Sequence, residues 1–292
     1  SCANAITVTN ANDSGAGSLR QAITGVCAGG TITFDDDYTI TLASQLELNK
    51  NITITGLGHH ITLNGNHAVR VFHIPGGANP TIDHLTITNG NLTNNDCAGS
   101  AMACGGGMLL EYGAAATISN STFSGNGAAS SSGVLDGGAI YSYWSNLTVT
   151  NSTFYGNNAY LYAGAIQVFY GSATLTNNTF YGNATLGYGG ALLNSWGTVT
   201  FRNNIFANNT AGAGGANCRN SSGTFNDGGG GLVWGDTSCP GINADPKLGT
   251  LGDYGGSTET LPLLPGSAAI DAGNNSVCPE FDQRDESRVG VC

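Results

Sequence analysis

Apolar and polar residues alternate along the middle of the chain, and the alternation recurs in four similar segments. In each segment one aliphatic residue stands between two hydroxyl residues, and a phenylalanine follows a few positions later. The aliphatic residues are Ile118, Val149, Leu175 and Val199, and the phenylalanines are Phe123, Phe154, Phe180 and Phe206. A period of two is typical of a β-strand with one buried face, whereas a helix needs apolar residues three and four positions apart. The phenylalanines lie 31, 26 and 26 residues apart, so one short unit repeats along the chain.

Each segment leads, after a variable loop, into a step of small residues. The steps read G-G-A-I, A-G-A-I, G-G-A-L and G-G-A-N, at 137–140, 163–166, 189–192 and 214–217. Glycine permits tight turns, and a strand–turn–strand–turn unit of about 26 residues describes one coil of a parallel β-solenoid. We predict roughly eight to ten coils about 4.8 Å apart, with stacked phenylalanines inside and a ladder of asparagine amides at the turns. A β-propeller is excluded, because its blades need about 40 residues.

The repeat weakens towards both ends of the chain, which predicts caps. Residues 17–26 favour a helix over the N-terminal end of the core, because Ser18 can cap it and Leu19, Ala22 and Ile23 give it an apolar face. Residues beyond 226 lose the repeat and carry prolines and acids. We therefore divide the chain into a β-helix with its N-terminal cap, residues 1–241, and an irregular C-terminal cap or tail packed on it, residues 242–292.

These motifs resemble known families. The pair F-x-x-N and G-G-A-I is similar to the repeats of chlamydial polymorphic outer-membrane proteins and related bacterial β-helix proteins. Residues 6–23 (I-T-V-T-N-A-N-D-S-G-A-G-S-L-R-Q-A-I) and the tail phrases at 244–273 and 282–284 resemble bacterial secreted β-helix proteins of the choice-of-anchor Q type. The resemblance covers most of the chain and implies an all-β fold, a single right-handed parallel β-helix exported to the cell surface. It implies no activity.

Charged residues make up 9% of the chain, and the formal net charge is −11 at pH 7. Nucleic-acid binding needs a basic stripe, which eight scattered lysines and arginines do not supply. No apolar run approaches the roughly 18 residues of a membrane span. We expect a secreted, extracellular or cell-surface protein, with Ser1 as the mature N-terminus after removal of a signal peptide.

Eight cysteines in such a chain predict four disulfides rather than a zinc site, since no C-x-x-C motif occurs. Sequence alone allows 105 pairings, and reduced buried thiols are the alternative. Proximity along the chain favours Cys2 with Cys27, Cys97 with Cys104, Cys218 with Cys239, and Cys278 with Cys292.

The central coils hold too few charges for the chemistry that parallel β-helix enzymes perform. Between Glu111 and Asp227 the one acid is Asp136, and the basic residues are Arg202 and Arg219. Glycosidases need two carboxylates flanking the scissile bond, and lyases need a base beside several acids. We therefore predict a protein that is not an enzyme, with no catalytic residue, no metal and no cofactor.

The histidines form the other candidate cluster. All five fall between His59 and His84, with Arg70 and Asp83 nearby. Their spacing matches no metal-binding motif, so we interpret them as surface or turn residues. The acids at 35–37 and in the C-terminal region follow no regular calcium spacing either.

Sequons for N-glycosylation are dense, although the repeat itself creates several of them. The candidate glycosylation sites are Asn12, Asn51, Asn91, Asn120, Asn146, Asn151, Asn177, Asn183, Asn208, Asn220 and Asn274.

The leading functional hypothesis is a structural surface protein that assembles with copies of itself through the β-helix ends, as a filament, surface layer or adhesin. The alternative is a carbohydrate-binding or carbohydrate-active protein whose aromatic residues stack on glycans. Its candidates are Tyr141, Tyr143, Trp144, Tyr160, Tyr162 and Trp196. Repeated Thr-x-Thr pairs raise ice binding as a minor alternative, which the uneven spacing of the pairs along the chain disfavours.

Overall fold

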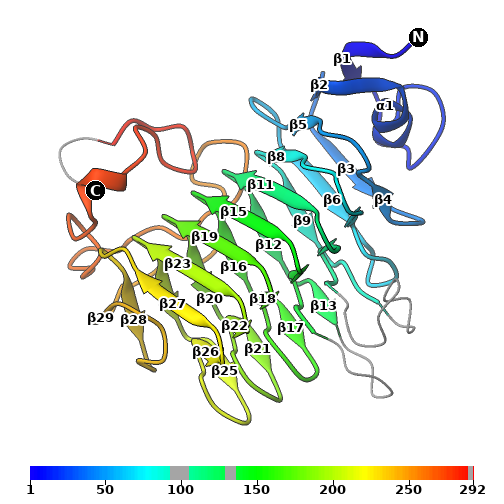
Figure 1. Ribbon diagram of the computed structural model, residues 1–292. Helices are drawn as coiled ribbons and strands as arrows, with labels where there is room; N and C mark the ends of the chain where they lie inside the picture. Colours follow the sequence, from blue (N-terminus) through cyan, green and yellow to red (C-terminus); the bar gives the residue numbers. More distant parts are fainter. Residues whose placement is uncertain (93–104, 129–135, 289–291) are drawn as a thin grey trace.

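The computed structural model describes residues 1–92, 105–128, 136–288 and 292. They wind into a right-handed solenoid of about eight turns, in which strands from successive turns stack into parallel sheets (Figure 1). The predicted all-β parallel β-helix is confirmed. We call the three long sheets A, B and C, and a short sheet between B and C is sheet D.

The strands of each sheet follow one another from the N-terminal end of the rod to the other end. Sheet A contains β1 (Ala3–Val8), β2 (Val26–Phe34), β5 (Thr53–Thr55), β8 (Thr81–Asp83), β11 (Ala115–Ser119), β15 (Asn146–Thr150), β19 (Ser172–Thr176), β23 (Thr198–Arg202) and β27 (Thr224–Asp227). Sheet B contains β3 (Tyr38–Thr41), β6 (Ile61–Asn64), β9 (Thr86–Thr88), β12 (Thr122–Ser124), β16 (Thr153–Tyr155), β20 (Thr179–Tyr181), β24 (Ile205–Ala207), β28 (Leu232–Trp234) and β29 (Ile242–Asn243).

Sheets C and D complete each turn. Sheet C contains β4 (Leu46–Glu47), β7 (Phe72–Ile74), β10 (Met108–Leu110), β14 (Ile140–Tyr143), β18 (Ile166–Phe169), β22 (Leu192–Ser195) and β26 (Cys218–Ser221). Sheet D contains β13 (Gly127–Ala128), β17 (Asn158–Ala159), β21 (Ala184–Thr185) and β25 (Thr210–Ala211).

A single asparagine turns the chain from sheet A towards sheet B in each central coil. Asn120, Asn151, Asn177 and Asn203 hold this corner with φ of 48°, 49°, 57° and 53°. Asparagine enters this left-handed region more readily than most residues with a side chain. The recurrence of asparagine in the sequence repeat therefore has a backbone cause. We call these four residues the corner asparagines.

The glycine of the small-residue step is required by the close approach of neighbouring coils. A Cβ atom on Gly138 would lie 2.2 Å from the carbonyl oxygen of Gly164, and one on Gly164 would lie 2.3 Å from that of Gly190. Both distances are shorter than any real contact of a methyl group, so no side chain fits at this step.

The phenylalanines of the repeat form the predicted stack inside the rod. The ring centroids of Phe123 and Phe154 lie 5.1 Å apart, those of Phe154 and Phe180 lie 4.7 Å apart, and those of Phe180 and Phe206 lie 4.6 Å apart. All four side chains are completely buried. The stack therefore ties four successive coils together through the core.

A ladder of asparagine amides runs parallel to the stack. Asn126, Asn157 and Asn183 each donate from Nδ2 to the Oδ1 of the next ladder residue, at 2.9–3.0 Å, and Asn209, the last of the series, donates to Asn217 Oδ1 at 2.9 Å. Each Nδ2 also donates to a backbone carbonyl, for example Asn157 to Phe123 O at 2.9 Å. The predicted amide ladder is confirmed, and it satisfies polar groups that burial would otherwise leave unpaired.

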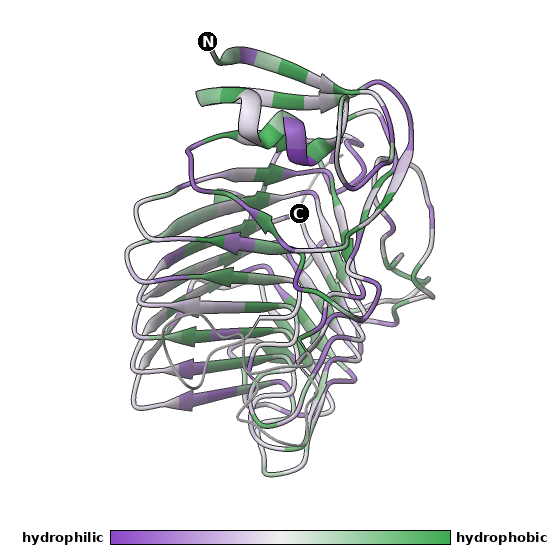
Figure 2. Cartoon of the chain, turned by 90° about the vertical axis from the view of Figure 1, so that its right-hand side faces the viewer, coloured by the Kyte–Doolittle hydropathy of each residue, from purple (hydrophilic) through white to green (hydrophobic). Residues whose placement is uncertain are grey.

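Both ends of the rod carry a cap or a disulfide. The predicted cap helix forms α1 (Leu19–Gly25), which buries Leu19, Ala22 and Ile23 and accepts its N-cap bond through Ser18. It lies beneath β1 and β2 at the N-terminal end (Figure 2). Disulfides join Cys2 to Cys27 in the first coil, Cys218 to Cys239 in the last, and Cys278 to Cys292 in the tail. These three predicted pairs are confirmed, whereas Cys97 and Cys104 lie outside the described residues.

The C-terminal segment, residues 244–292, leaves the last coil and runs back along the outside of the rod (Figure 1). Its described part has isolated bridges and one 3-10 turn, η1 (Asn275–Val277). The segment reaches back to an early coil, where the backbone N–H of Gly58 donates to Ser257 Oγ at 3.0 Å. Among the described residues, the ladder of sheet B ends with β29.

Candidate functional site

The corner asparagines form the line on which the C-terminal segment docks. Asn151 Nδ2 donates to the carbonyl oxygen of Phe281 at 3.0 Å. Asn203 exchanges two hydrogen bonds with the backbone of Asn274, at 2.6 and 3.2 Å. The turn residues of the repeat therefore also bind the tail. We call the contact between the tail and the corners of the rod the seam, and polar groups that are distant in sequence lie close together there.

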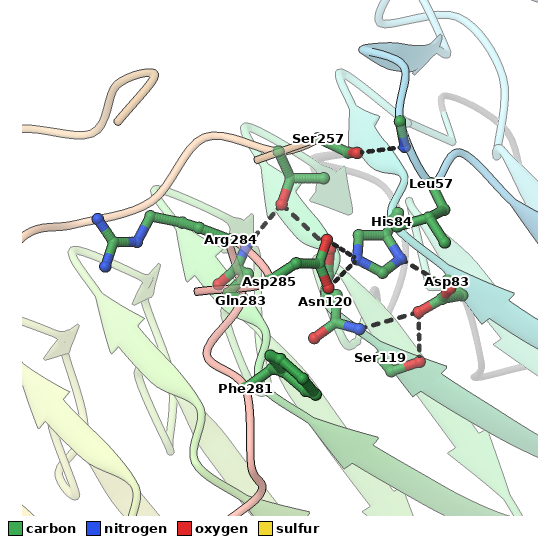
Figure 3. Close-up of polar contacts among 12 residues, drawn as sticks. Leu57, Asp83, His84, Ser119, Asn120, Ser257, Phe281, Gln283, Arg284 and Asp285 are labelled. Atoms are coloured by element: carbon green, nitrogen blue, oxygen red, sulfur yellow. Dashed lines mark hydrogen bonds and ion pairs between the residues drawn. The ribbon is translucent and has the colours of Figure 1, made fainter. Parts of the chain in front are cut away.

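The strongest titratable cluster of this seam surrounds His84 (Figure 3). His84 lies at the corner after β8, has φ of 54° and is 3% exposed. Its Nδ1 lies 2.7 Å from Asp83 Oδ2, and its Nε2 lies 2.9 Å from Oδ2 of Asp285 in the tail. Asp83 also accepts from Ser119 Oγ at 2.7 Å and from Asn120 Nδ2 at 3.1 Å.

The two carboxylates decide the charge of the imidazole. Burial alone would lower the pKa of His84, but the hydrogen bonds and charges of Asp83 and Asp285 outweigh it and raise the pKa. Burial likewise opposes the ionised form of Asp83, and hydrogen bonds from His84 and Ser119 reverse this effect and lower the pKa of Asp83. The cluster is therefore an ion pair extended across the seam.

The arrangement lacks the geometry of a nucleophilic triad. A hydroxyl nucleophile must donate to the imidazole that removes its proton. Ser119 instead donates to Asp83, and the remaining imidazole nitrogen faces Asp285 (Figure 3). The cluster is built as a clamp for the tail.

The histidine cluster considered from the sequence separates into distinct environments. His73 lies on the outer face of sheet C, with Nδ1 2.6 Å from Glu47 Oε2 and Nε2 3.1 Å from Glu111 Oε1. Arg70 is completely buried, and its Nη1 donates to Gln45 Oε1 at 2.8 Å. Within the described ranges no group of three or more histidine, cysteine or acidic residues is arranged to hold a metal ion.

Beside the His84 cluster, a cavity of about 420 Å³ lies between the tail and the rod. The rod contributes Asn151, Asn177 and Asn203, and the tail contributes Asp282, Arg284 and Arg288. Gln283 borders it and binds across the seam, donating from Nε2 to Thr122 Oγ1 at 2.9 Å and accepting from Thr153 Oγ1 at 2.8 Å.

A family model describing a right-handed β-helix region matches residues 49–239, about two thirds of the chain. The chain belongs to this right-handed β-helix family. No curated protein matches the chain.

The outer edge of sheet C of the β-helix carries a stripe of aromatic rings. Tyr112, Trp144, Tyr170 and Trp196 follow the ends of successive strands, with ring centroids 6.0, 4.4 and 5.1 Å apart. We call these four residues the aromatic stripe. Trp144 and Trp196 were candidates from the sequence, whereas Tyr112 and Tyr170 were not recognised as candidates. The signal that could have identified them is that each of the four aromatic residues follows a strand of sheet C at the same place in the repeat.

The other aromatic candidates have different surroundings. Tyr141 is buried on the outer face of sheet C, and Tyr143 stacks on Phe169 with centroids 5.8 Å apart. Tyr162 stacks on Tyr188, and Tyr160 is exposed. The structure thus places Tyr141, Tyr143, Trp144 and Trp196 on sheet C or at its edge, and it leaves Tyr160 and Tyr162 in the loop layer.

Threonines align on the outer face of sheet A of the β-helix despite their uneven sequence spacing. The aligned residues are Thr31, Thr53, Thr81, Thr117, Thr148, Thr174 and Thr200. Loops absorb the differences in spacing, so the sequence argument against a regular hydroxyl array was wrong. The neighbouring row has Asp83 and Arg202 in register with threonines, which interrupts the array.

Burial corrects part of the glycosylation prediction. Asn183 is completely buried in the amide ladder, and Asn151 is 6% exposed with Nδ2 bonded to the tail. Attaching a glycan requires an accessible amide nitrogen, so these two sequons are removed from the candidates. The sequons with exposed asparagines are Asn12, Asn51, Asn146, Asn208 and Asn220.

Proposed function

We propose that the chain is a non-enzymatic, extracellular β-helix protein of a structural kind, whose copies join end to end at a surface. The observation that carries the proposal is the pair of free strand edges in sheet A. Among the described residues, sheet A begins with β1 and ends with β27, and neither strand has a further partner. Unpaired strand edges are templates for another chain.

The two edges are complementary because every strand pair in sheet A is parallel. Placing β1 of one copy on β27 of the next would continue the ladder in the same direction. Such a head-to-tail contact does not close on itself and produces a filament. The disulfides of the first and last coils support this by holding the edge coils in shape.

The N-terminal cap limits which surfaces can take part in the proposed end-to-end contact. α1 covers the apolar core at the N-terminal end, so core-to-core stacking is blocked there. The proposed contact therefore depends on backbone hydrogen bonds of sheet A, with Trp234 and Ile242, both exposed in the last coil, adding apolar area.

The burial of Asp136 and the contacts of His84 support a protein that is not an enzyme, and the disulfides support an extracellular one. Asp136 is 3% exposed, and both nitrogens of His84 are engaged. Disulfides persist in oxidising compartments. Among the described residues no helix is long and apolar enough to cross a membrane.

A proline at the edge of β1 tests the assembly. Val8 O accepts from Asp35 N at 3.2 Å, and backbone groups of alternate residues face opposite sides of a parallel strand. The N–H of Ala5 therefore faces the free edge. Ala5→Pro removes this donor, whereas the matched control Ala5→Val keeps it.

We expect filaments of wild type and Ala5→Val in electron microscopy and sedimentation, and monomers of Ala5→Pro with an unchanged circular dichroism spectrum. Wild-type protein that stays monomeric at every concentration, or Ala5→Pro filaments equal to those of wild type, would refute the proposal.

Carbohydrate binding is the second candidate, because the aromatic stripe is exposed. Sugars stack on ring faces, but most faces of the stripe already cover one another: Tyr170 stacks on Trp144 at 10° and on Trp196 at 9°. Trp196 ends the stripe and keeps one free face. A glycan array bound by wild type and not by Trp196→Ala would favour this candidate, with Leu186→Ala, at an exposed side chain outside the aromatic stripe, as control.

A further inference from the structure

The cavity between tail and rod combines a concave shape with groups that lack partners. Its volume of about 420 Å³ falls within the range of roughly 300–1,000 Å³ found for small-molecule sites. Three of the corner asparagines, Asn151, Asn177 and Asn203, form its floor, and residues 282–284 of the tail with Arg288 form one wall. Binding here would not depend on end-to-end assembly, because the cavity lies on the side of the rod.

The charges in this wall do not balance. Asp282 Oδ2 accepts from Arg284 Nε at 3.0 Å and from Arg284 Nη2 at 2.6 Å. Asp282 Oδ1 accepts from the backbone N–H groups of Arg284 and Glu286. The guanidinium of Arg284 therefore neutralises Asp282, the one carboxylate among the residues that line the cavity.

The second guanidinium has no carboxylate partner among the described residues. Arg288 Nη2 donates to the neutral Asn151 Oδ1 at 3.4 Å. Burial lowers the pKa of Arg288, the charge of Asp282 opposes this, and the charge of Arg284 adds to it. A cationic group thus faces the cavity with no carboxylate of the described residues in ion-pair contact, in a protein whose net charge is −11.

An unpaired acceptor lies on the floor of the same cavity. Asn177 Oδ1 is buried and has no hydrogen-bond partner among the described residues. Buried carbonyl oxygens are nearly always paired. A ligand that fills the cavity would therefore supply an anion to Arg288 and a hydroxyl donor to Asn177.

We propose that this cavity binds a small polyhydroxylated anion of the sugar-acid class, with its carboxylate on Arg288 and a hydroxyl donating to Asn177 Oδ1. The apolar residues Leu261 and Leu263 of the tail also line the cavity and would contact the C–H face of the ring.

Calorimetric titration with sodium glucuronate tests the site, with glucose as the neutral probe of similar size. Arg288→Gln removes the charge, and Arg219→Gln, on the exposed end of sheet C, is the matched control. Loss of a charge-assisted hydrogen bond predicts a fall in glucuronate affinity of about tenfold or more for Arg288→Gln. Wild type and Arg219→Gln should bind equally.

Asn177→Asp provides a second variant, because aspartate also tolerates the left-handed corner and its carboxylate would repel the ligand. We expect it to weaken glucuronate binding as well. Glucuronate that fails to bind wild type, equal binding to Arg288→Gln, or equal affinity for glucose and glucuronate would each overturn the proposal. If both variants unfold, the preference of wild type between the two sugars decides.

Discussion

Asp136 is the carboxyl group whose ionisation should most affect the stability of the rod. Burial raises its pKa from 3.8 to about 8, against a hydrogen bond from Gln167 that lowers it. Asp136 Oδ1 and Gln167 Oε1 are buried and have no hydrogen-bond partner among the described residues. A proton on the carboxyl group would give this pair of acceptors a donor, so the protein holds Asp136 in its neutral form.

The sign and size of the effect follow from linkage. A pKa raised in the folded state means that the stability is fully present below the unfolded value near 4 and is lost as the pH rises through about 8. Each tenfold change in proton affinity corresponds to about 1.4 kcal/mol. The loss between pH 4 and pH 8 is then at most about 5 kcal/mol, and relaxation around the carboxylate would reduce it to a few kcal/mol.

Asp136→Asn keeps the size of the side chain and supplies an amide N–H towards Gln167. We expect the variant to match wild type at pH 4 and to exceed its free energy of unfolding by about 2–4 kcal/mol at pH 8. Urea unfolding followed by circular dichroism at pH 4, 6 and 8 measures the difference. Asp36→Asn is the control, because Asp36 is exposed, and it should change stability by less than about 0.5 kcal/mol.

A difference between Asp136→Asn and wild type that is the same at all three pH values would refute this reasoning, as would a variant that is less stable at pH 8. Either result would mean that Asp136 is hydrated and ionised in the folded protein.

Two further outcomes follow from the core and the tail. Phe154→Ala should lower the free energy of unfolding by about 3–5 kcal/mol because it breaks the buried stack, and Phe281→Ala, whose ring is 43% exposed, should cost less than about 1 kcal/mol in the same urea assay. Asp285→Asn should speed trypsin cleavage after Arg284 about threefold or more at pH 6. The difference in cleavage rate between variant and wild type should shrink at alkaline pH. The pKa of His84 is raised in the folded protein, so its ion pairs with Asp83 and Asp285 are complete below the unfolded pKa of about 6.5 and are lost as the pH rises through the folded pKa. An unchanged cleavage rate at pH 6 would contradict the clamp.

The repeated coil could be predicted from the sequence because the packing of each coil on the next requires the same residue types at the same positions. Phe154 and Phe180 recur because the same position in each coil faces the core, and Gly138 recurs because the next coil passes too close for a side chain. Ser18 and the apolar face of α1 likewise follow from capping and helical spacing within seven residues.

Contacts that depend on the path of the tail could not be predicted from the sequence. His84 and Asp285 lie 201 positions apart, and the tail has no repeat that would fix its register on the rod. The interpretation of the histidines as surface or turn residues was wrong for His73, which is buried in β7 of sheet C, whereas His84 does stand at a turn, the corner between sheets A and B. Neighbours in sequence therefore faced different sides of the rod.

The sequons show how one residue type can combine several roles. Asn120, Asn151 and Asn177 stand at corners where the backbone requires a left-handed residue, and the following hydroxyl residue begins sheet B. The sequon is therefore a consequence of turn and strand chemistry. The amides of Asn151 and Asn177 also bind the tail and line the cavity, so a glycan at either corner would compete with the docked tail. Glycans, if attached, belong on exposed positions away from the seam, such as Asn146 and Asn208.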